Sequence, residues 1–227
     1  MRSAVAQIFN DKSKNLKWHN RNYFYAGTVF VVLLNICLYA FLGGDFQQSV
    51  ADPTPMWSKF TLSNFVRVLA NSYSHANWQH VLLNMLCFLF VGIYLERRMG
   101  SLRLLALIFV MSFATATAVT ANDLSYHWHG FSGVNYGLYA YTIVDYCFSF
   151  RKETRNKTNI ILGAVVMVAI VVFMCFAGGT TGFSFKPYPV DLITNRGHYS
   201  SFIPGLLLGL TVNITKLSVI SDRSTKQ

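Results

Sequence analysis

The residues best suited to catalysis lie in the stretch HGFSGVNYG, residues 129–137. Here a serine stands between glycines at the start of an apolar run. A serine hydroxyl is a weak nucleophile until a neighbouring base accepts its proton, and histidine often serves as that base. His198, in the stretch GHYSSFIPG, opens a second apolar run. Ser132 and His198 therefore have two interpretations, as packing residues or as a nucleophile and its general base.

A second group of polar residues lies in the stretch HANWQHVLLNM, where His80 and Asn84 are four residues apart. Residues at this spacing share one face of a helix. Together with the backbone N–H of Ser132, their side chains suit an oxyanion site for acyl transfer. The alternative is that His80 and Asn84 are interfacial residues bonded to loop backbone or water. That interpretation fits best for His75, the first residue of the stretch.

A carboxylate usually orients the histidine of a serine nucleophile. The chain has nine Asp and Glu residues, and only Asp145, within an apolar segment, and Glu96, directly at the end of one, belong to the membrane part. Both lie near the opposite ends of these segments, about 20 Å from Ser132 at about 1.5 Å per helical residue. The sequence therefore predicts a Ser-His dyad. Tyr136, one turn beyond Ser132, is placed where its ring could stack on His198 and hold the imidazole instead of a carboxylate.

The elements that position these residues are long apolar segments. Of the 227 residues, 53% are hydrophobic and 12% are charged, whereas soluble domains have about 25% charged residues. A bilayer core about 30 Å thick needs about 20 apolar residues in a helix. Six segments qualify, and the sequence predicts an all-α membrane protein built as a six-helix transmembrane bundle. The segments are 24–42, 79–95, 102–120, 131–149, 159–177 and 199–217.

Basic residues cluster before the first segment, between the second and third, between the fourth and fifth, and after the sixth. This alternation follows the positive-inside rule, so both termini are expected in the cytoplasm. It also accounts for the net charge of +10, and no nucleic-acid partner is expected. The predicted organisation is a cytoplasmic segment 1–22, a six-helix domain 23–217 and a cytoplasmic tail 218–227.

The second, fourth and sixth segments then run from the outer to the inner face, which brings their polar first turns to a similar depth. Ionisable groups in membrane segments are costly and are functional candidates. The fourth and sixth segments each contain two glycines four residues apart, a pattern that lets helices approach closely. These pairs are Gly133 with Gly137 and Gly205 with Gly209. If the two glycine faces meet, Ser132 and His198 come together.

Four motifs in order resemble those of the rhomboid intramembrane serine proteases. HANWQHVLLN is similar to the family's H-x4-H-x3-N, GFSG to its G-x-S-G, ERRMGS to its E-x-R-x-G-S, and GHYSSFIPG to its late histidine followed by small residues. The resemblance spans most of the chain and is closest to the six-helix prokaryotic form. It implies Ser132 as nucleophile, His198 as general base, and His80 and Asn84 at the oxyanion site.

The resemblance also implies supporting roles. Tyr136 supports the histidine ring, His75 is mainly structural, and Gly130 and Gly133 flank the serine where its helix begins. Two positions depart from the family pattern. Val66 stands where a tryptophan usually precedes an arginine, which weakens the expected anchoring of the first outer loop in lipid. Ser201 replaces a usual glycine, so the fourth and sixth helices are expected to pack slightly farther apart.

The implied function is an intramembrane serine endopeptidase that needs no cofactor. Its expected partners are transmembrane protein substrates, cut near the outer end of a transmembrane segment, and the lipid bilayer. The expected location is the bacterial inner (plasma) membrane, as a multi-pass protein. The aromatic-rich loop 43–78 is expected to lie partly in the outer leaflet. The glycine- and proline-rich loop 178–197 has two interpretations, as a mobile cap over the site or as an ordinary connector.

Two other functions compete with this one. A metal site or metal transporter is suggested by five histidines on the outer side, namely His75, His80, His127, His129 and His198. Against it, there is no HExxH motif and no carboxylate in the outer half of a membrane segment. The second is a catalytically silent rhomboid relative that binds membrane clients, against which the presence of both Ser132 and His198 argues. The four cysteines fall inside predicted helices and indicate neither a disulfide framework nor a metal site.

Overall fold

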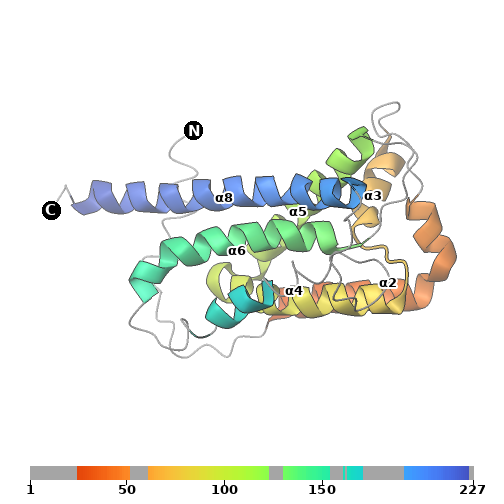
Figure 1. The fold of residues 1–227 in the computed structure, drawn as a ribbon, viewed down its shortest axis with the longest axis horizontal. Coiled ribbons are helices and arrows are strands. Elements are labelled where there is room, and N and C mark those ends of the chain that lie inside the picture. The colour runs from red at the N-terminus through yellow and green to blue at the C-terminus, as the bar shows by residue number, and fades with distance from the viewer. Residues whose placement is uncertain are drawn as a thin grey trace.

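The computed structural model describes residues 25–51, 61–122, 130–153, 161, 163–170 and 192–224. Throughout these ranges the regular secondary structure is α-helix, without strands, so the all-α prediction is confirmed there. The helices are α2 (Ala26–Ala51), α3 (Leu62–Asn71), α4 (Trp78–Met99), α5 (Ser101–Asn122), α6 (Ser132–Glu153) and α8 (Leu192–Ser224) (Figure 1). Residues 163–170 are helical as well.

Five of the six predicted apolar segments coincide with α2, α4, α5, α6 and α8. The fifth segment, 159–177, is described only at 161 and 163–170, where it is helical. Helix α8 begins at Leu192 rather than at 199, so the end of the predicted loop 178–197 is helical. The segment 1–22 and the rest of that loop, up to residue 191, lie outside the described residues.

Helix α3 lies within the stretch 43–78, for which the sequence predicted only an interfacial loop. Its apolar residues Leu62, Phe65, Val66 and Leu69 have helical spacing. The Phe65 ring lies 6.2 Å from the Phe113 ring of α5, whereas Leu62 is 77% and Val66 54% exposed. One side of α3 therefore packs on the bundle and another presents apolar side chains outwards. Trp57 and Phe60 lie outside the described residues.

The outward faces of the helices are apolar, as a membrane requires. Among the described helices, α4 is the one long and apolar enough to span a membrane by length and composition, and three others contain shorter apolar stretches. Phe41 is 83% exposed, Leu102 81% and Leu207 57%. Apolar surface of this extent is unfavourable in water and is solvated by acyl chains in a bilayer.

Helices α6 and α8 lie side by side and form the most extensive pair among the described helices (Figure 1). A Cβ atom added to Gly205 would collide with the backbone carbonyl of Gly137, and one added to Gly209 would lie 3.0 Å from the Cβ of Val144. The two backbones approach this closely because no side chain separates them. The condition considered from the sequence, that the two glycine faces meet, is thus met at Gly137 and Gly205.

Ser201, which replaces a usual glycine, is fully buried on α8. A Cβ on Gly137 would lie 3.1 Å from the Cβ of Ser201, so the glycine of α6 leaves room for the serine. The Ser201 hydroxyl is hydrogen-bonded to the hydroxyl of Thr115 and lies 3.2 Å from the carbonyl of Met111, both on α5. The serine thus connects α8 to α5. Its effect on the spacing of α6 and α8 stays a prediction.

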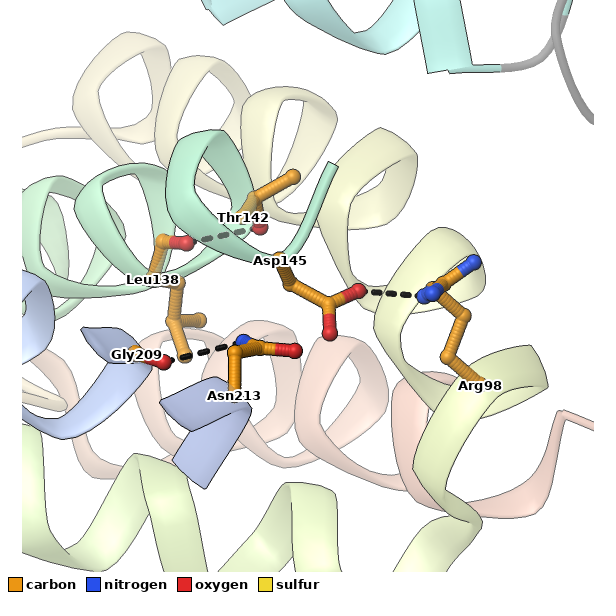
Figure 2. A network of polar contacts seen from close by, with 6 residues as sticks. All are labelled: Arg98, Leu138, Thr142, Asp145, Gly209 and Asn213. Carbon is orange, nitrogen blue, oxygen red and sulfur yellow. Dashed lines mark hydrogen bonds and ion pairs between the residues drawn. The ribbon is translucent and has the colours of Figure 1, made fainter. Parts of the chain in front are cut away.

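Polar contacts also connect the C-terminal halves of α4 and α6, away from Ser132. Arg98 of α4 forms an ion pair with Asp145 of α6, shown in Figure 2, and its guanidinium lies 5.4 Å from the centre of the Tyr94 ring. Asn213 of α8 donates its side-chain N–H to the carbonyl of Gly209 at 2.9 Å in the same region (Figure 2). The ion pair joins α4 to α6 more than three helical turns beyond Ser132, whereas the Asn213 contact stays within α8.

Glu96 holds the start of α2 against the end of α4. Its carboxylate accepts hydrogen bonds from the backbone N–H groups of Gly27, at 2.9 Å, and Thr28, at 2.8 Å. It also accepts from the hydroxyls of Thr28, at 2.6 Å, and Ser101. A negative charge is favourable at a helix N-terminus because the first N–H groups lack partners within the helix. Both acidic residues of the predicted segments are thus engaged in structural contacts.

Candidate active site at the start of helices α4, α6 and α8

Ser132 is the first residue of α6, and His198 lies in the second turn of α8. Ser132 Oγ and His198 Nε2 are 3.1 Å apart, within hydrogen-bonding distance. Ser132 is half-buried and His198 is 5% exposed. The close contact of Gly137 with Gly205 lies farther along the same two helices and sets their separation. In this geometry an imidazole can accept the proton of a serine hydroxyl.

The ring of Tyr136 lies flat on the ring of His198. The ring centres are 4.1 Å apart and the planes differ by 4°. Tyr136 is 8% exposed, so packing holds its ring in place. Because a stacked partner restricts rotation of the imidazole, this contact helps to keep Nε2 directed at Ser132.

The start of α4 places two histidines beside the start of α6. Asn77 caps α4, and its side chain accepts a hydrogen bond of 2.8 Å from the backbone N–H of His80. His75, in the preceding turn, is fully buried, and its Nε2 lies 3.4 Å from the backbone nitrogen of Phe131, which donates to it. The rings of His75 and His80 meet edge to face at 5.2 Å. His75 therefore links this turn to the residue before Ser132.

Gly130 brings the backbone before Ser132 directly against α4. Its φ is +115°, a conformation that favours glycine. A Cβ at this position would lie 2.8 Å from His80 Nε2 and 3.5 Å from Asn84 Nδ2. Both nitrogens therefore face the segment that leads into Ser132. A Cβ at 130 would displace the His80 ring, whereas it would only touch Asn84 Nδ2. Gly133, the other flanking glycine, is buried in the first turn of α6.

Asn84 is 2% exposed, and its side-chain nitrogen has no hydrogen-bond partner among the described residues. Its backbone carbonyl and its side-chain oxygen both face the Nδ2 of Asn135, at 3.1 Å and 3.4 Å. Asn135 was not among the site residues predicted from the sequence. The signal was present, because Asn135 is a polar residue in the same apolar run as Ser132, three residues beyond it.

Phe131 is a second residue that the sequence did not single out. It is fully buried, and its ring packs edge to face on Tyr73, at 5.7 Å, and on Phe88 of α4, at 5.2 Å. This aromatic contact anchors the start of α6 to α4 and to the turn after α3. The position of Phe131 between Gly130 and Ser132 was the feature of the sequence that could have drawn attention to it.

The structure does not bring the acidic residues to Ser132, since Glu96 and Asp145 are bound elsewhere. In the described part of the chain, no three His, Cys, Asp or Glu side chains gather as a metal site would require. His127 and His129 lie outside the described residues, as does Cys175. The three described cysteines are free thiols; they are Cys37, Cys87 and Cys147.

Comparison with known proteins identifies relatives. The family model of the rhomboid domain matches residues 62–214, which include α3 to α6 and most of α8. The chain is also 26% identical over 153 residues to the Rhomboid-like protease 1 of Toxoplasma gondii. That alignment covers 65% of this chain and 47% of the relative, so the chain spans about half the length of the curated relative it matches.

Proposed function

This chain belongs to the rhomboid family, a family of integral membrane proteins, and on that premise we propose that it is an intramembrane serine endopeptidase. The observation that carries the proposal is the 3.1 Å contact between Ser132 Oγ and His198 Nε2. The contact lies where α6 and α8 begin to pack, among largely buried residues. A serine and a histidine at this distance form the minimal pair for acyl transfer.

In the proposed reaction, Ser132 Oγ attacks the carbonyl carbon of the scissile peptide bond while its proton passes to His198 Nε2. The tetrahedral intermediate collapses as the carbon–nitrogen bond breaks and His198 returns that proton to the leaving amine. The resulting ester on Ser132 is attacked by a water molecule, whose proton passes to His198. Collapse of the second intermediate releases the carboxyl product, and His198 returns the proton to Ser132.

The negative oxygen of each intermediate needs hydrogen-bond donors in fixed positions. Three donors are proposed: the backbone N–H of Ser132, the side chain of His80 and the Nδ2 of Asn84. The N–H groups in the first turn of a helix lack partners within the helix, which favours an anion there. The absence of a partner for Asn84 Nδ2 among the described residues supports its role as a donor.

The remaining residues of the site are proposed to position these groups. Tyr136 holds the imidazole by stacking, Gly130 lets the chain approach His80, and His75 ties the turn before α4 to Phe131. A dyad is the simplest interpretation, because both acidic residues of the apolar segments bind structural partners at a distance from Ser132. No cofactor is required by this chemistry.

The proposed substrate is another membrane protein. Peptide carbonyls in a helix are occupied by hydrogen bonds, so the substrate must unwind where it is cut. Small or helix-breaking residues near the scissile bond favour unwinding. Cleavage near the outer end of a transmembrane segment fits a site located at the N-terminal ends of α4 and α6.

We propose a multi-pass topology of six spans, with both termini in the cytoplasm and the protein in the bacterial plasma membrane. The alternation of basic clusters along the sequence supports this orientation. The same topology divides the chain into the segment 1–22, the domain 23–217 and the tail 218–227. Labelling of single introduced cysteines from either side of sealed vesicles tests the orientation.

The catalytic proposal is tested with purified protein in liposomes and a transmembrane reporter substrate. The parent chain, Ser132→Ala and His198→Ala are compared, with Ser112→Ala as a matched buried serine of α5 that lies outside the site. We expect cleavage and fluorophosphonate labelling by the parent and by Ser112→Ala. We expect both to be lost in Ser132→Ala, and cleavage to be lost in His198→Ala.

Cleavage that persists in Ser132→Ala would refute Ser132 as the nucleophile. A parent chain that is folded, yet is neither labelled nor active on reporters of varied sequence, would instead be a silent relative that binds membrane clients.

A further inference from the structure

Asn135 is fully buried on α6, three residues beyond Ser132, and its side chain faces α4. Its Nδ2 lies 3.1 Å from the backbone oxygen and 3.4 Å from the side-chain oxygen of Asn84. We propose that Asn135 is a positioning residue that fixes the orientation of the Asn84 side-chain amide, so that Asn84 Nδ2 donates to the oxyanion. This inference rests on the proposed protease function.

The orientation follows from the donors and acceptors of the two amides. A side-chain amide has one end that donates and one that accepts, and the two ends have nearly the same shape. The backbone carbonyl of Asn84 is only an acceptor, so the end of Asn135 that faces it must be the N–H end. The same N–H group faces the Asn84 side chain, so the end of Asn84 that meets it must be the oxygen.

This arrangement leaves Nδ2 as the end of Asn84 that is directed away from Asn135. That nitrogen is buried and has no hydrogen-bond partner among the described residues. It lies beside Gly130 on the same side as His80 Nε2, since a Cβ on Gly130 would approach both atoms. A rotated Asn84 amide would instead place an acceptor at this position and repel a negative oxygen.

An unpartnered buried donor is unfavourable, and without a constraint the amide of Asn84 would rotate towards any available acceptor. Asn135 opposes this rotation, because a rotated Asn84 would set two N–H groups against each other. The donor is thereby held in place before the intermediate forms, which is the condition for effective oxyanion stabilisation. The partner lies 51 residues away in the chain and on another helix.

The test is a double-mutant cycle on the reporter assay in liposomes, with kcat, KM and the rate of fluorophosphonate labelling measured. The variants are Asn84→Ala, Asn135→Leu and the double variant. The control is Asn35→Leu, since Asn35 is a buried asparagine of α2 that donates to the Val31 carbonyl, outside the site. Asn135→Ala repeats the cycle in case leucine prevents folding, which thermal unfolding reveals.

Loss of one oxyanion donor costs about 100-fold or more in kcat, which is the result expected for Asn84→Ala. For Asn135→Leu we expect a loss of kcat of about 10-fold with KM nearly unchanged, and a parallel loss of labelling rate, because an unconstrained amide still samples the productive orientation. In the double variant the loss equals that of Asn84→Ala alone, since Asn135 acts through Asn84. Asn35→Leu keeps the parental rate.

Multiplicative losses in the double variant would overturn the inference, because they would show that Asn135 acts independently of Asn84. Full activity in a folded Asn135 variant would also overturn it. These outcomes differ from failure of the proposed function, in which the parent chain itself neither cleaves the reporter nor reacts with the fluorophosphonate. That result would overturn the proposed function and this inference together.

Discussion

Replacement of Gly205 by alanine tests whether helix packing sets the catalytic distance. A Cβ at this position would lie much closer than 3.0 Å to the backbone carbonyl of Gly137. Real Cβ atoms essentially never approach another heavy atom closer than 3.0 Å. The obstructing atoms belong to the backbone, so no side-chain rotation relieves the contact. The strain is relieved only if α8 moves away from α6, and His198 lies on α8 while Ser132 lies on α6.

The expected loss of activity follows from the distance between Ser132 and His198. A separation of the helices by about 1 Å would take the present 3.1 Å contact of Ser132 Oγ and His198 Nε2 to about 4 Å, beyond hydrogen-bonding range. Misplacement of reacting groups by about 1 Å costs about 100-fold in rate. Excess volume in a packed core also costs about 1–3 kcal/mol of stability. Gly205→Ala is therefore expected to lose about 100-fold in kcat and to unfold at a lower temperature.

The assay measures reporter cleavage in liposomes and thermal unfolding for Gly205→Ala and for the matched variant Gly209→Ala. A Cβ on Gly209 meets the Val144 side chain at 3.0 Å and the Tyr141 Cα at 3.4 Å, so a shift of a few tenths of an ångström suffices. We expect this control to keep most of its activity. Full activity of folded Gly205→Ala, or an equal loss in Gly209→Ala, would refute the link between the glycine contact and the catalytic distance.

Two further predictions concern other contacts. Asp145→Ala leaves the partly buried Arg98 without its ion-pair partner and is expected to destabilise the protein by about 3 kcal/mol. Replacement of both Arg98 and Asp145 by leucine should restore much of that loss in thermal unfolding; a double variant less stable than the single one would contradict this. Tyr136→Leu removes the ring stacked on His198 and is expected to lower kcat by about 2- to 12-fold, whereas Tyr136→Phe keeps the stack. Equal kcat values for these two variants would argue against a role for the stacked ring.

Local patterns predicted most of the helices because hydropathy is a property of neighbouring residues. The segment 79–95 lies within α4, and 102–120 lies within α5. Helix α3 was missed because it is short and amphipathic and lies in a stretch of mixed aromatic and polar residues. The start of α8 was placed too late, since Gly197 and the polar residues before it are typical of a loop, yet they continue the helix in the structure.

In the candidate site, too, some residues could be predicted from local sequence and others could not. Ser132, His198, His80 and Asn84 were recognisable because polar residues are conspicuous at the ends of apolar segments. Asn135 was not recognised as part of the site. The sequence shows an isolated asparagine between Val134 and Tyr136, and its significance depends on a partner that is 51 residues away.

Local sequence was enough to predict that the chain forms apolar helices, that acidic residues are few, and that a serine and a histidine stand at the starts of two apolar segments. The packing of the helices was needed to show that Ser132 and His198 are 3.1 Å apart, that Tyr136 lies flat on the histidine, and that Asn135 faces both oxygens of Asn84. Helix formation and side-chain chemistry follow from local composition. Distances between helices depend instead on how closely surfaces far apart in the sequence can pack, and here Gly137 and Gly205 let the backbones of α6 and α8 approach closely.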